Sequence, residues 1–239
     1  FVPEIGIIEL PFIYPSREVA YQTLDDAEVK ARFASFCDAK GFVFIGYTEN
    51  EFRDLTNSKG PVRKPEDLKG LKIRVVEGPV FIDTFKALGA NPTPLPFPEI
   101  YNALQQKVID GQDNPIFTSF MMKFTEVNKF ATLTNHILTE CPVVVSKRFW
   151  NSLKPEQQKL FREAALVQIK VNREENAKNR IKAMEKVKAQ GVDVVILTDA
   201  EKAAFKQAVQ PVLDKYRGVY GADWYDFFLK KVASYSSKK

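Results

Sequence analysis

The amino-acid sequence predicts an α/β fold, on three observations. Short, continuous apolar runs at residues 42–47 and 71–76 are typical of strands that are buried on both faces of a parallel sheet. Helical stretches lie between these runs and end at glycines, for example at Gly41. Across residues 155–190 no glycine or proline interrupts the chain after Pro155, while apolar residues recur at three- and four-residue steps. This pattern predicts one long amphipathic helix.

The first half of the chain is predicted to contain, in order, a β-like segment, a helix, a strand, a polar loop, a second strand and a second helix. These elements span residues 2–13, 17–40, 42–47, 48–64, 71–76 and 79–88. Prolines then alternate through the motif NPTPLPFPEI (residues 91–100), which disfavours a helix and favours an extended edge segment. Proline this dense also stiffens the chain around Phe97.

Residues 99–106 are predicted to be helical, and residues 108–115 to form a strand that leads into a turn. Because the residue before a proline is pushed away from the α region, Asn114, before Pro115, is expected on that turn. A helix over 118–130 and strands over 134–139 and 141–146 follow. After the long helix come a strand at 192–197, a helix at 199–217 that a Thr198–Glu201 capping box opens, and a last helix at 224–232.

Composition and charge bound the class of protein. The chain has 239 residues, of which 45% are hydrophobic, and the formal net charge is +5. No run of 18 uncharged apolar residues occurs, so no membrane-spanning helix is expected, and the opening residues FVPEIGIIELPF do not look like a signal peptide. Glutamates interleave with the cations of residues 170–188, which favours a solvated helix face over a nucleic-acid surface.

Residues that could perform catalysis are few. The chain has one histidine, His136, and none of the common nucleophile, zinc or nucleotide motifs, so neither a catalytic residue nor a cofactor is predicted. His136 stands at the entry to an apolar run, where a structural histidine is the favoured interpretation. Cys37 and Cys141 are too few for a disulfide framework and are not spaced for a metal; they could pair or remain free.

Arg74 is the residue that most suggests a binding function. It falls inside the apolar run 71–76, near the end of a predicted strand, and in open α/β sheets ligands bind beyond the carboxyl ends of the strands. A guanidinium group there is costly unless an anion meets it. Two interpretations are open: a carboxylate ligand, bound through paired charge-assisted hydrogen bonds, or a fixed salt bridge to Glu77 or Asp83.

Four motifs carry a family resemblance over almost the whole chain. They are ELPFIYP (9–15), RDLTNSKGPVRKPEDLKGLKIRV (53–75), LGANPTPLPFPEIYNALQQKVIDGQDNP (88–115) and KFTEVNKFATLTNHIL (123–138). With these motifs the chain resembles the substrate-binding proteins of tripartite ATP-independent periplasmic (TRAP) transporters, the DctP family. One departure is Glu51, which stands where the family often has a glycine, and it leaves the reach of Arg53 open.

The resemblance implies the roles of five residues. The arginine of the KIRV motif, here Arg74, pairs with the ligand carboxylate, and Asn114 of DGQDNP hydrogen-bonds the ligand. Arg53 is a further expected ligand contact, Phe97 forms an apolar wall, and Glu77 either hydrogen-bonds a ligand hydroxyl or ammonium or pairs with Arg74. No metal ligand is implied.

The resemblance also implies a two-lobed periplasmic-binding-protein fold of type II-like form with a long interdomain helix. Lobe 1 is expected at 1–50 and 140–180, and lobe 2 at 51–139 and 181–230, with the ligand cleft between them. Family members begin with a further strand-and-helix stretch, so the N-terminal part of lobe 1 is expected to be absent from this sequence.

The function implied is periplasmic capture of a small organic acid, such as a C4-dicarboxylate, by hinge closure. Delivery would be to the small and large integral membrane subunits of the transporter. A sugar acid, either a uronate or sialic acid, is the alternative ligand, and an enzyme that uses the same cleft with His136 or Glu77 as its base is the alternative class.

Overall fold

The computed structural model describes residues 1–237 and divides into two compact units. Unit 1 comprises Phe1–Glu51, Leu138–Ala177 and the chain from Tyr216 onward, and unit 2 comprises Phe52–Ile137 and Lys178–Lys215. The mixture of helices and strands confirms the predicted α/β class. Among the described residues, none of the helices is both long enough and apolar enough to span a membrane.

A six-stranded mixed sheet is the framework of unit 2. Its strands are β2 (Asp54–Asn57), β3 (Lys72–Val75), β4 (Asn91–Pro94), β5 (Gly111–Asn114), β6 (Phe130–Leu133) and β8 (Asp193–Ile196), in the order β4-β3-β5-β2-β6-β8. Strand β3 runs parallel to both β4 and β5, and β6 runs parallel to β8. Strand β2 is antiparallel to its neighbours β5 and β6. The proline-rich segment β4 is an edge strand, as predicted.

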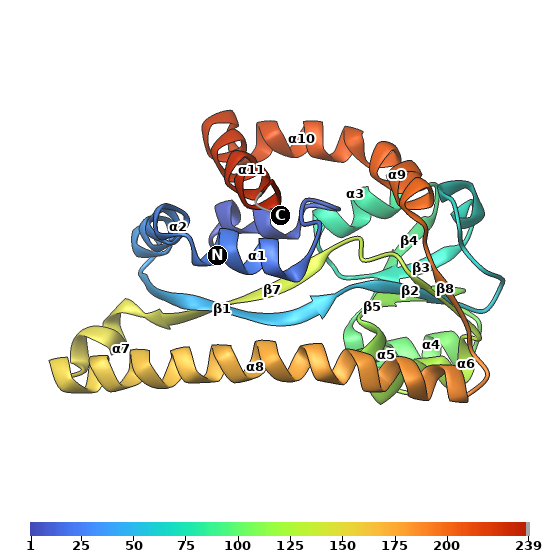
Figure 1. Cartoon of the computed structure of the whole chain (residues 1–239), viewed down its shortest axis with the longest axis horizontal. Coiled ribbons are helices and arrows are strands. Elements are labelled where there is room, and N and C mark those ends of the chain that lie inside the picture. The colour runs from blue at the N-terminus through green and yellow to red at the C-terminus, as the bar shows by residue number, and fades with distance from the viewer. Residues whose placement is uncertain (238–239) are drawn as a thin grey trace. The chain divides into compact units, whose positions relative to one another are not determined.

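Helices cover both faces of this sheet. They are α3 (Pro79–Ala87), α4 (Ile100–Gln105), α5 (Ile116–Met121), α6 (Phe124–Val127) and α9 (Asp199–Ala208), with short 3-10 turns η2 (Pro65–Leu68) and η3 (Phe97–Glu99). Figure 1 shows α3 and α9 on one side of the strands and α4, α5 and α6 on the other. Buried apolar side chains from both segments of unit 2 form a shared core, for example Ile116 with Val187.

Unit 1 combines a two-stranded sheet with helices. Its elements are η1 (Pro3–Glu9), α1 (Arg17–Asp25), α2 (Ala27–Ala39), β1 (Phe42–Phe52), β7 (Leu138–Ser146), α7 (Lys147–Ser152) and α11 (Ala222–Ser236), and strands β1 and β7 pair. Aromatic rings fill its core: Phe33 meets Trp224 and Phe228 edge-on, at centroid distances of 5.2 and 6.1 Å. Helix α8 (Pro155–Ala189) contributes residues to both units, and α10 (Gln210–Tyr220) also continues from unit 2 into unit 1.

Local capping explains where several helices begin and end. Ser16 accepts a hydrogen bond from the Val19 amide at 3.3 Å, and Asp26 accepts one from the Glu28 amide at 2.9 Å. Because Asp26 caps a second helix, the helix predicted over 17–40 is in fact two. The predicted capping box of Thr198 and Glu201 is confirmed.

Other element predictions were wrong, each for an identifiable reason. Residues 2–13 are not β-like: Pro3 opens the 3-10 helix η1. The helix predicted over 199–217 breaks at Val209, and α10 begins with Gln210-Pro211, because proline is tolerated only in the first turn. The polar segment 48–64 is not a loop but contains the end of β1 and all of β2.

The strand and turn around Asn114 are also shifted. Strand β5 covers Gly111–Asn114, so Asn114 is the last strand residue rather than a turn residue. Gly111 packs tightly against β2: a Cβ placed on it would lie 2.4 Å from the Thr56 carbonyl oxygen. Only glycine fits at this position without a shift of the strands.

The units differ from the predicted lobe boundaries at the C-terminus. Residues 216–230 were assigned to lobe 2, but this part of the chain belongs to unit 1, because Trp224 and Phe228 pack against Phe33. The long helix ends at Ala189, close to the predicted end. Its apolar stripe is not a simple core face, since Leu160, Val167 and Ile181 are each more than 60% exposed.

Candidate ligand-binding site

Strand register places polar side chains side by side in unit 2. Arg74 of β3 is the direct partner of Gln112 on β5, and Gln112 is the direct partner of Thr56 on β2. Directly paired residues project from the same face of a sheet, so these three side chains form one row. Asn114, two residues after Gln112, lies on the same face at the carboxyl end of β5.

Arg74 is buried, with 4% of its surface exposed, and its guanidinium is held by a main-chain carbonyl. Its Nε and one terminal nitrogen donate to the Leu95 carbonyl oxygen at 2.9 and 2.7 Å. Within residues 1–237 no ion pair forms on this guanidinium. Burial lowers the pKa of Arg74, and the nearby Arg53 charge lowers it further, against the opposing effect of Asp113. The group is a desolvated cation that no carboxylate neutralises by direct contact.

The salt-bridge interpretation of Arg74 is therefore wrong. Glu77 is exposed in the bend after β3 and makes no ion pair with Arg74, although its charge slightly favours the cation. Asp83 pairs instead with Lys215, whose Nζ lies 2.6 Å away. What holds Arg74 in place is the Leu95 carbonyl.

Arg53 lies just before β2 and has a different environment. Its Nε donates to Asp113 Oδ2 at 2.6 Å, and a terminal nitrogen donates to the Asp113 carbonyl and, at 3.4 Å, to Asn114 Oδ1. The guanidinium carbon also lies 5.2 Å from the centroid of the Phe81 ring. Arg53 is thus fixed on one buried carboxylate, so its charge is largely compensated inside unit 2.

Asp113 links Arg53 to His136. Burial raises the pKa of the Asp113 carboxyl, but the Arg53 charge and the hydrogen bonds from His136 and Arg53 outweigh burial, so the pKa lies below its ordinary value. His136 Nε2 lies 3.4 Å from Asp113 Oδ2, and its Nδ1 lies 2.7 Å from Thr134 Oγ1. The Phe85 ring meets the imidazole edge-on. The histidine predicted to be structural therefore contacts the side chains of Asp113, Thr134 and Phe85.

Asn114 is held by its neighbours on both sides of its amide. It is 4% exposed, its Nδ2 donates to Gln112 Oε1 at 2.6 Å, and its Oδ1 accepts from Arg53. Gln112 in turn donates from Nε2 to Thr56 Oγ1 at 2.8 Å and to Ser119 Oγ at 3.0 Å. Every member of this network except Arg53 lies on β2, β5 or the first turns of α5.

Phe97 lies on η3, beyond the end of β4. It is 38% exposed and meets Phe124 edge-on at a centroid distance of 6.1 Å, so one side of its ring is available to an apolar contact. Together, the five predicted residues all belong to unit 2, at or beyond the carboxyl ends of β3, β4 and β5. Their contact with a ligand stays a prediction.

Two residues of this network were missed from the sequence. Asp113 compensates Arg53, and Gln112 holds Asn114, yet within DGQDNP only Asn114 was predicted as a site residue. The signal that was available is the density of polar residues in a short strand, since a fully buried strand of polar side chains requires internal partners. Arg53, Arg74 and Asn114 all present hydrogen-bond donors at one edge of the sheet, which is the chemistry an anion requires.

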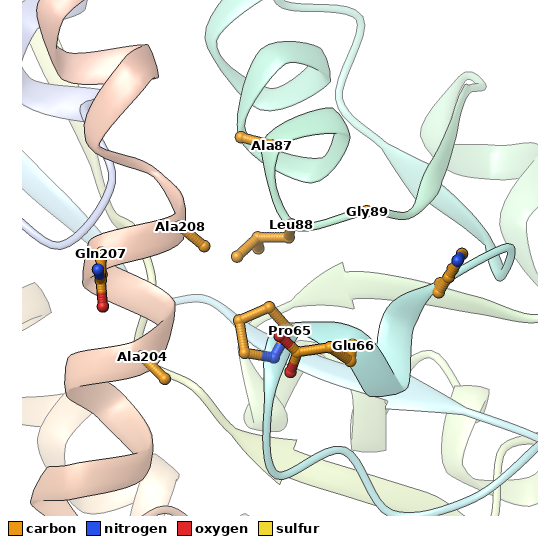
Figure 2. Close-up of a pocket in the computed structure, with 9 residues that line it drawn as sticks. Pro65, Glu66, Ala87, Leu88, Gly89, Ala204, Gln207 and Ala208 are labelled. Atoms are coloured by element: carbon orange, nitrogen blue, oxygen red, sulfur yellow. The ribbon is translucent and has the colours of Figure 1, made fainter.

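A separate depression of about 490 Å³ lies elsewhere in unit 2. Figure 2 shows its walls, formed by Pro65 and Glu66, by Ala87–Gly89 and by one face of α9 at Ala204, Gln207 and Ala208. It shares no residue with the arginine network, and small apolar side chains form most of its wall. Among the described residues no cluster of His, Cys, Asp and Glu could hold a metal ion, and Cys37 and Cys141 are both free thiols.

Comparison with known proteins gives a consistent picture. Residues 1–218 match the model of the family described as bacterial extracellular solute-binding protein, family 7 (DctP). The chain is 37% identical over 207 residues to the 2,3-diketo-L-gulonate-binding periplasmic protein YiaO of Escherichia coli, covering 87% of this chain and 62% of that protein. It is 31% identical over 227 residues to the C4-dicarboxylate-binding periplasmic protein DctP of Rhodobacter capsulatus, covering 93% and 66% respectively. The chain thus spans just under two thirds of the length of these two relatives.

Solved structures agree with the sequence comparison. The sugar acid binding protein DctPAm of Advenella mimigardefordensis, in complex with galactonate, superposes with a TM-score of 0.91 at 31% identity, covering 98% of this chain and 75% of that one. A TRAP periplasmic solute binding protein from Polaromonas, bound to D-erythronate, superposes with a TM-score of 0.88 at 34% identity, covering 96% and 75%. The predicted two-lobed TRAP binding-protein fold is confirmed by these likenesses.

Proposed function

The chain belongs to the bacterial extracellular solute-binding protein family 7, the DctP family, and we propose that it captures a small organic acid for a TRAP transporter. One observation carries this proposal: Arg74 is a buried guanidinium at the carboxyl end of a sheet, with no carboxylate in contact. Such a group is stable beside an anion and is well shaped to bind a carboxylate through two hydrogen bonds.

The charges around Arg74 favour a ligand with one carboxylate. Arg53 and Arg74 supply two positive charges and Asp113, whose pKa is lowered, supplies one negative charge, so one positive charge is left. A monoanionic sugar acid meets that charge with one carboxylate and uses its hydroxyls as acceptors for the remaining donors. The names of relatives that bind 2,3-diketo-L-gulonate and galactonate support this class.

A C4-dicarboxylate is the second candidate ligand. The relative from Rhodobacter capsulatus is named for C4-dicarboxylates, and a similar protein from Shewanella oneidensis holds succinate. A second carboxylate would require another cation beyond Arg74, since Asp113 already engages Arg53. Uronates remain within the proposal as sugar acids, and a similar protein from Sulfitobacter holds β-D-galacturonate.

Family membership supports two further parts of the proposal, the location of the protein and its partners. We propose a periplasmic protein that delivers its acid to the small and large membrane subunits of the transporter. Capture by closure of two lobes over the acid belongs to the same proposal. Small-angle X-ray scattering tests it, since closure predicts a smaller radius of gyration when the acid is added.

Binding without chemistry is the proposed activity. An enzyme would need a free base near the acid, and the one histidine, His136, is engaged with Asp113 and Thr134. Conversion of a bound acid, followed by NMR over hours, would favour the enzyme alternative if replacing His136 abolished turnover and left binding intact.

A thermal-shift screen tests the proposed function. The panel contains aldonates, uronates, sialic acid, keto and hydroxy acids and C4-dicarboxylates, and it is run on the wild type, Arg74→Ala and Arg148→Ala. Arg148 is exposed on α7 and serves as the matched arginine control. An acid at a hundred times its Kd should stabilise the wild type and the control by about 2.7 kcal/mol. Failure of every acid, or a shift that survives the loss of Arg74, would overturn the proposal.

A further inference from the structure

Gln112 is a fully buried glutamine whose amide has a partner at each end. It is 0% exposed, its Nε2 donates to Thr56 Oγ1 and Ser119 Oγ at 2.8 and 3.0 Å, and its Oε1 accepts from Asn114 Nδ2 at 2.6 Å. In the sheet it is the direct neighbour of Arg74. Because Gln112 and its three partners are all buried, its amide can affect a ligand only through those partners.

The direction of hydrogen bonding along this chain of amides is set by Arg53. A guanidinium can only donate, so Asn114 must turn its Oδ1 toward Arg53, at 3.4 Å, and its Nδ2 toward Gln112. Gln112 must then present Oε1 to Asn114 and Nε2 to the two hydroxyls. Reversing the Asn114 amide would set donor against donor at Arg53 and acceptor against acceptor at Gln112. Arg53 itself is anchored by its 2.6 Å contact to Asp113.

We propose that Gln112 is a positioning residue that, together with Arg53, makes Asn114 present an N–H donor to the acid. One Nδ2 proton of Asn114 is used by Gln112 Oε1, and the second proton remains for a ligand acceptor. The inference rests on the proposed function, because it concerns the same site. With Gln112 Oε1 holding one Nδ2 proton, Asn114 offers its other N–H to the ligand. This donor favours an electronegative ligand atom, such as a carboxylate oxygen, and disfavours an ammonium group at the same place.

Gln112→Met tests this role, because methionine keeps the length of the side chain and removes the acceptor. The matched control is Gln207→Met, the same change at an exposed site on α9. D-Galactonate and succinate are the probes, and isothermal titration gives their Kd for the wild type and both variants. The acid that binds the wild type should bind Gln112→Met roughly ten- to a hundredfold more weakly, as expected for one hydrogen bond to a charged group, and should bind the control unchanged.

NMR of the Asn114 side-chain amide separates positioning from a merely structural role, and its wild-type measurement does not require any variant to fold. In the wild type, the acid should shift one Nδ2 proton of Asn114 downfield and leave the other nearly unmoved. In Gln112→Met that response should be lost, while the backbone amides of the sheet stay dispersed.

The outcomes distinguish this inference from the proposed function. An unchanged Kd in a folded Gln112→Met, or no selective shift of an Asn114 proton in the wild type, overturns the role of Gln112 and leaves acid capture standing. Failure of both acids and of the wider panel to bind the wild type overturns acid capture and the role of Gln112 together.

Discussion

Arg53 and Asp113 form a fully buried ion pair in unit 2. The Arg53 Nε lies 2.6 Å from Asp113 Oδ2, and the two residues are 2% and 0% exposed. This contact separates the roles of the two arginines: Arg53 is compensated within the protein, whereas Arg74 is held only by the Leu95 carbonyl. It also anchors the amide network that runs through Asn114 to Gln112.

Asp113→Asn should destabilise the protein strongly, because it leaves the Arg53 charge buried without its partner. Breaking a buried ion pair from one side costs about 3–5 kcal/mol of the free energy of unfolding. Urea denaturation followed by circular dichroism measures the loss. The matched control is Asp226→Asn, which removes the partner of the exposed Arg217 at 2.6 Å and should leave the midpoint nearly unchanged. Equal losses in the two variants would contradict the role given to Asp113.

The lowered pKa of Asp113 also predicts a pH dependence with a definite sign. A carboxyl with a lower pKa in the folded state contributes stability that is present above the unfolded value, about 3.9, and is lost as pH falls through the folded value. The wild type should therefore lose stability below about pH 4 more steeply than Asp113→Asn does. Thermal melts at pH 3 to 7 check this, and parallel curves would contradict it.

The pKa of Glu140 is shifted in the opposite direction to that of Asp113, so its effect on stability should have the opposite pH dependence. This side chain of β7 is 2% exposed and neither of its oxygens has a hydrogen-bond partner, so burial, with help from the nearby Glu49 charge, raises its pKa well above the ordinary value. A carboxyl that holds its proton more tightly when folded loses stability as pH rises above its unfolded pKa, about 4.3. Glu140→Gln should thus raise the Tm, and by more at pH 8 than at pH 4.

Glu201 supplies a control with the reversed sign. It accepts hydrogen bonds from the Thr198 amide and hydroxyl, and these lower its pKa. Glu201→Gln should therefore cost stability near neutral pH and cost less as pH falls below about 4.3. If the Tm difference for Glu140→Gln were the same at every pH, the inferred pKa shift of Glu140 would be wrong.

Sequence patterns predicted the elements that are continuous apolar runs or have a regular helical spacing of apolar residues. The apolar runs around β3 and β8 and the uninterrupted helix α8 were found close to their observed bounds. Strand β2 was missed because three of its four residues, Asp54, Thr56 and Asn57, are polar and yet fully buried. They are buried because their partners come from distant segments: Arg180 donates to Asp54 at 2.8 Å, and Gln112 donates to Thr56. Such pairings depend on strand register and cannot be seen in a hydrophobic pattern.

In the candidate site, too, some residues could be predicted from the sequence and others could not. The position of Arg74 at a strand end followed from the apolar run around it, and the family resemblance supplied Arg53, Asn114 and Phe97. The partners that set their charge and direction, Asp113 and Gln112, could not be derived, because both depend on which residues face each other across β2, β3 and β5. From the sequence a salt bridge for Arg74 was an equally open interpretation, but the next two acidic residues along the chain, Glu77 and Asp83, make no ion pair with it.

Glu51, near the end of β1, offers a test of backbone strain. Its φ of +76° lies in the left-handed region, and its buried carboxylate lies 3.3 Å from Arg17. That conformation costs a residue with a Cβ roughly 1 kcal/mol, which explains why the DctP resemblance places a glycine there. Glu51→Gly and Glu51→Ala both remove the carboxylate, so their difference isolates the backbone. The glycine variant should be more stable than the alanine variant by about 1 kcal/mol in urea denaturation.

Glu163 is the matched comparison, because it is exposed within α8, where the backbone is helical. There the order should invert, and glycine should be less stable than alanine by about 1 kcal/mol. If the alanine variant were more stable than the glycine variant at both positions, Glu51 would not be strained. If the order inverts as expected, Glu51 occupies a backbone conformation that glycine would adopt freely, two residues before the arginine that anchors the amide network.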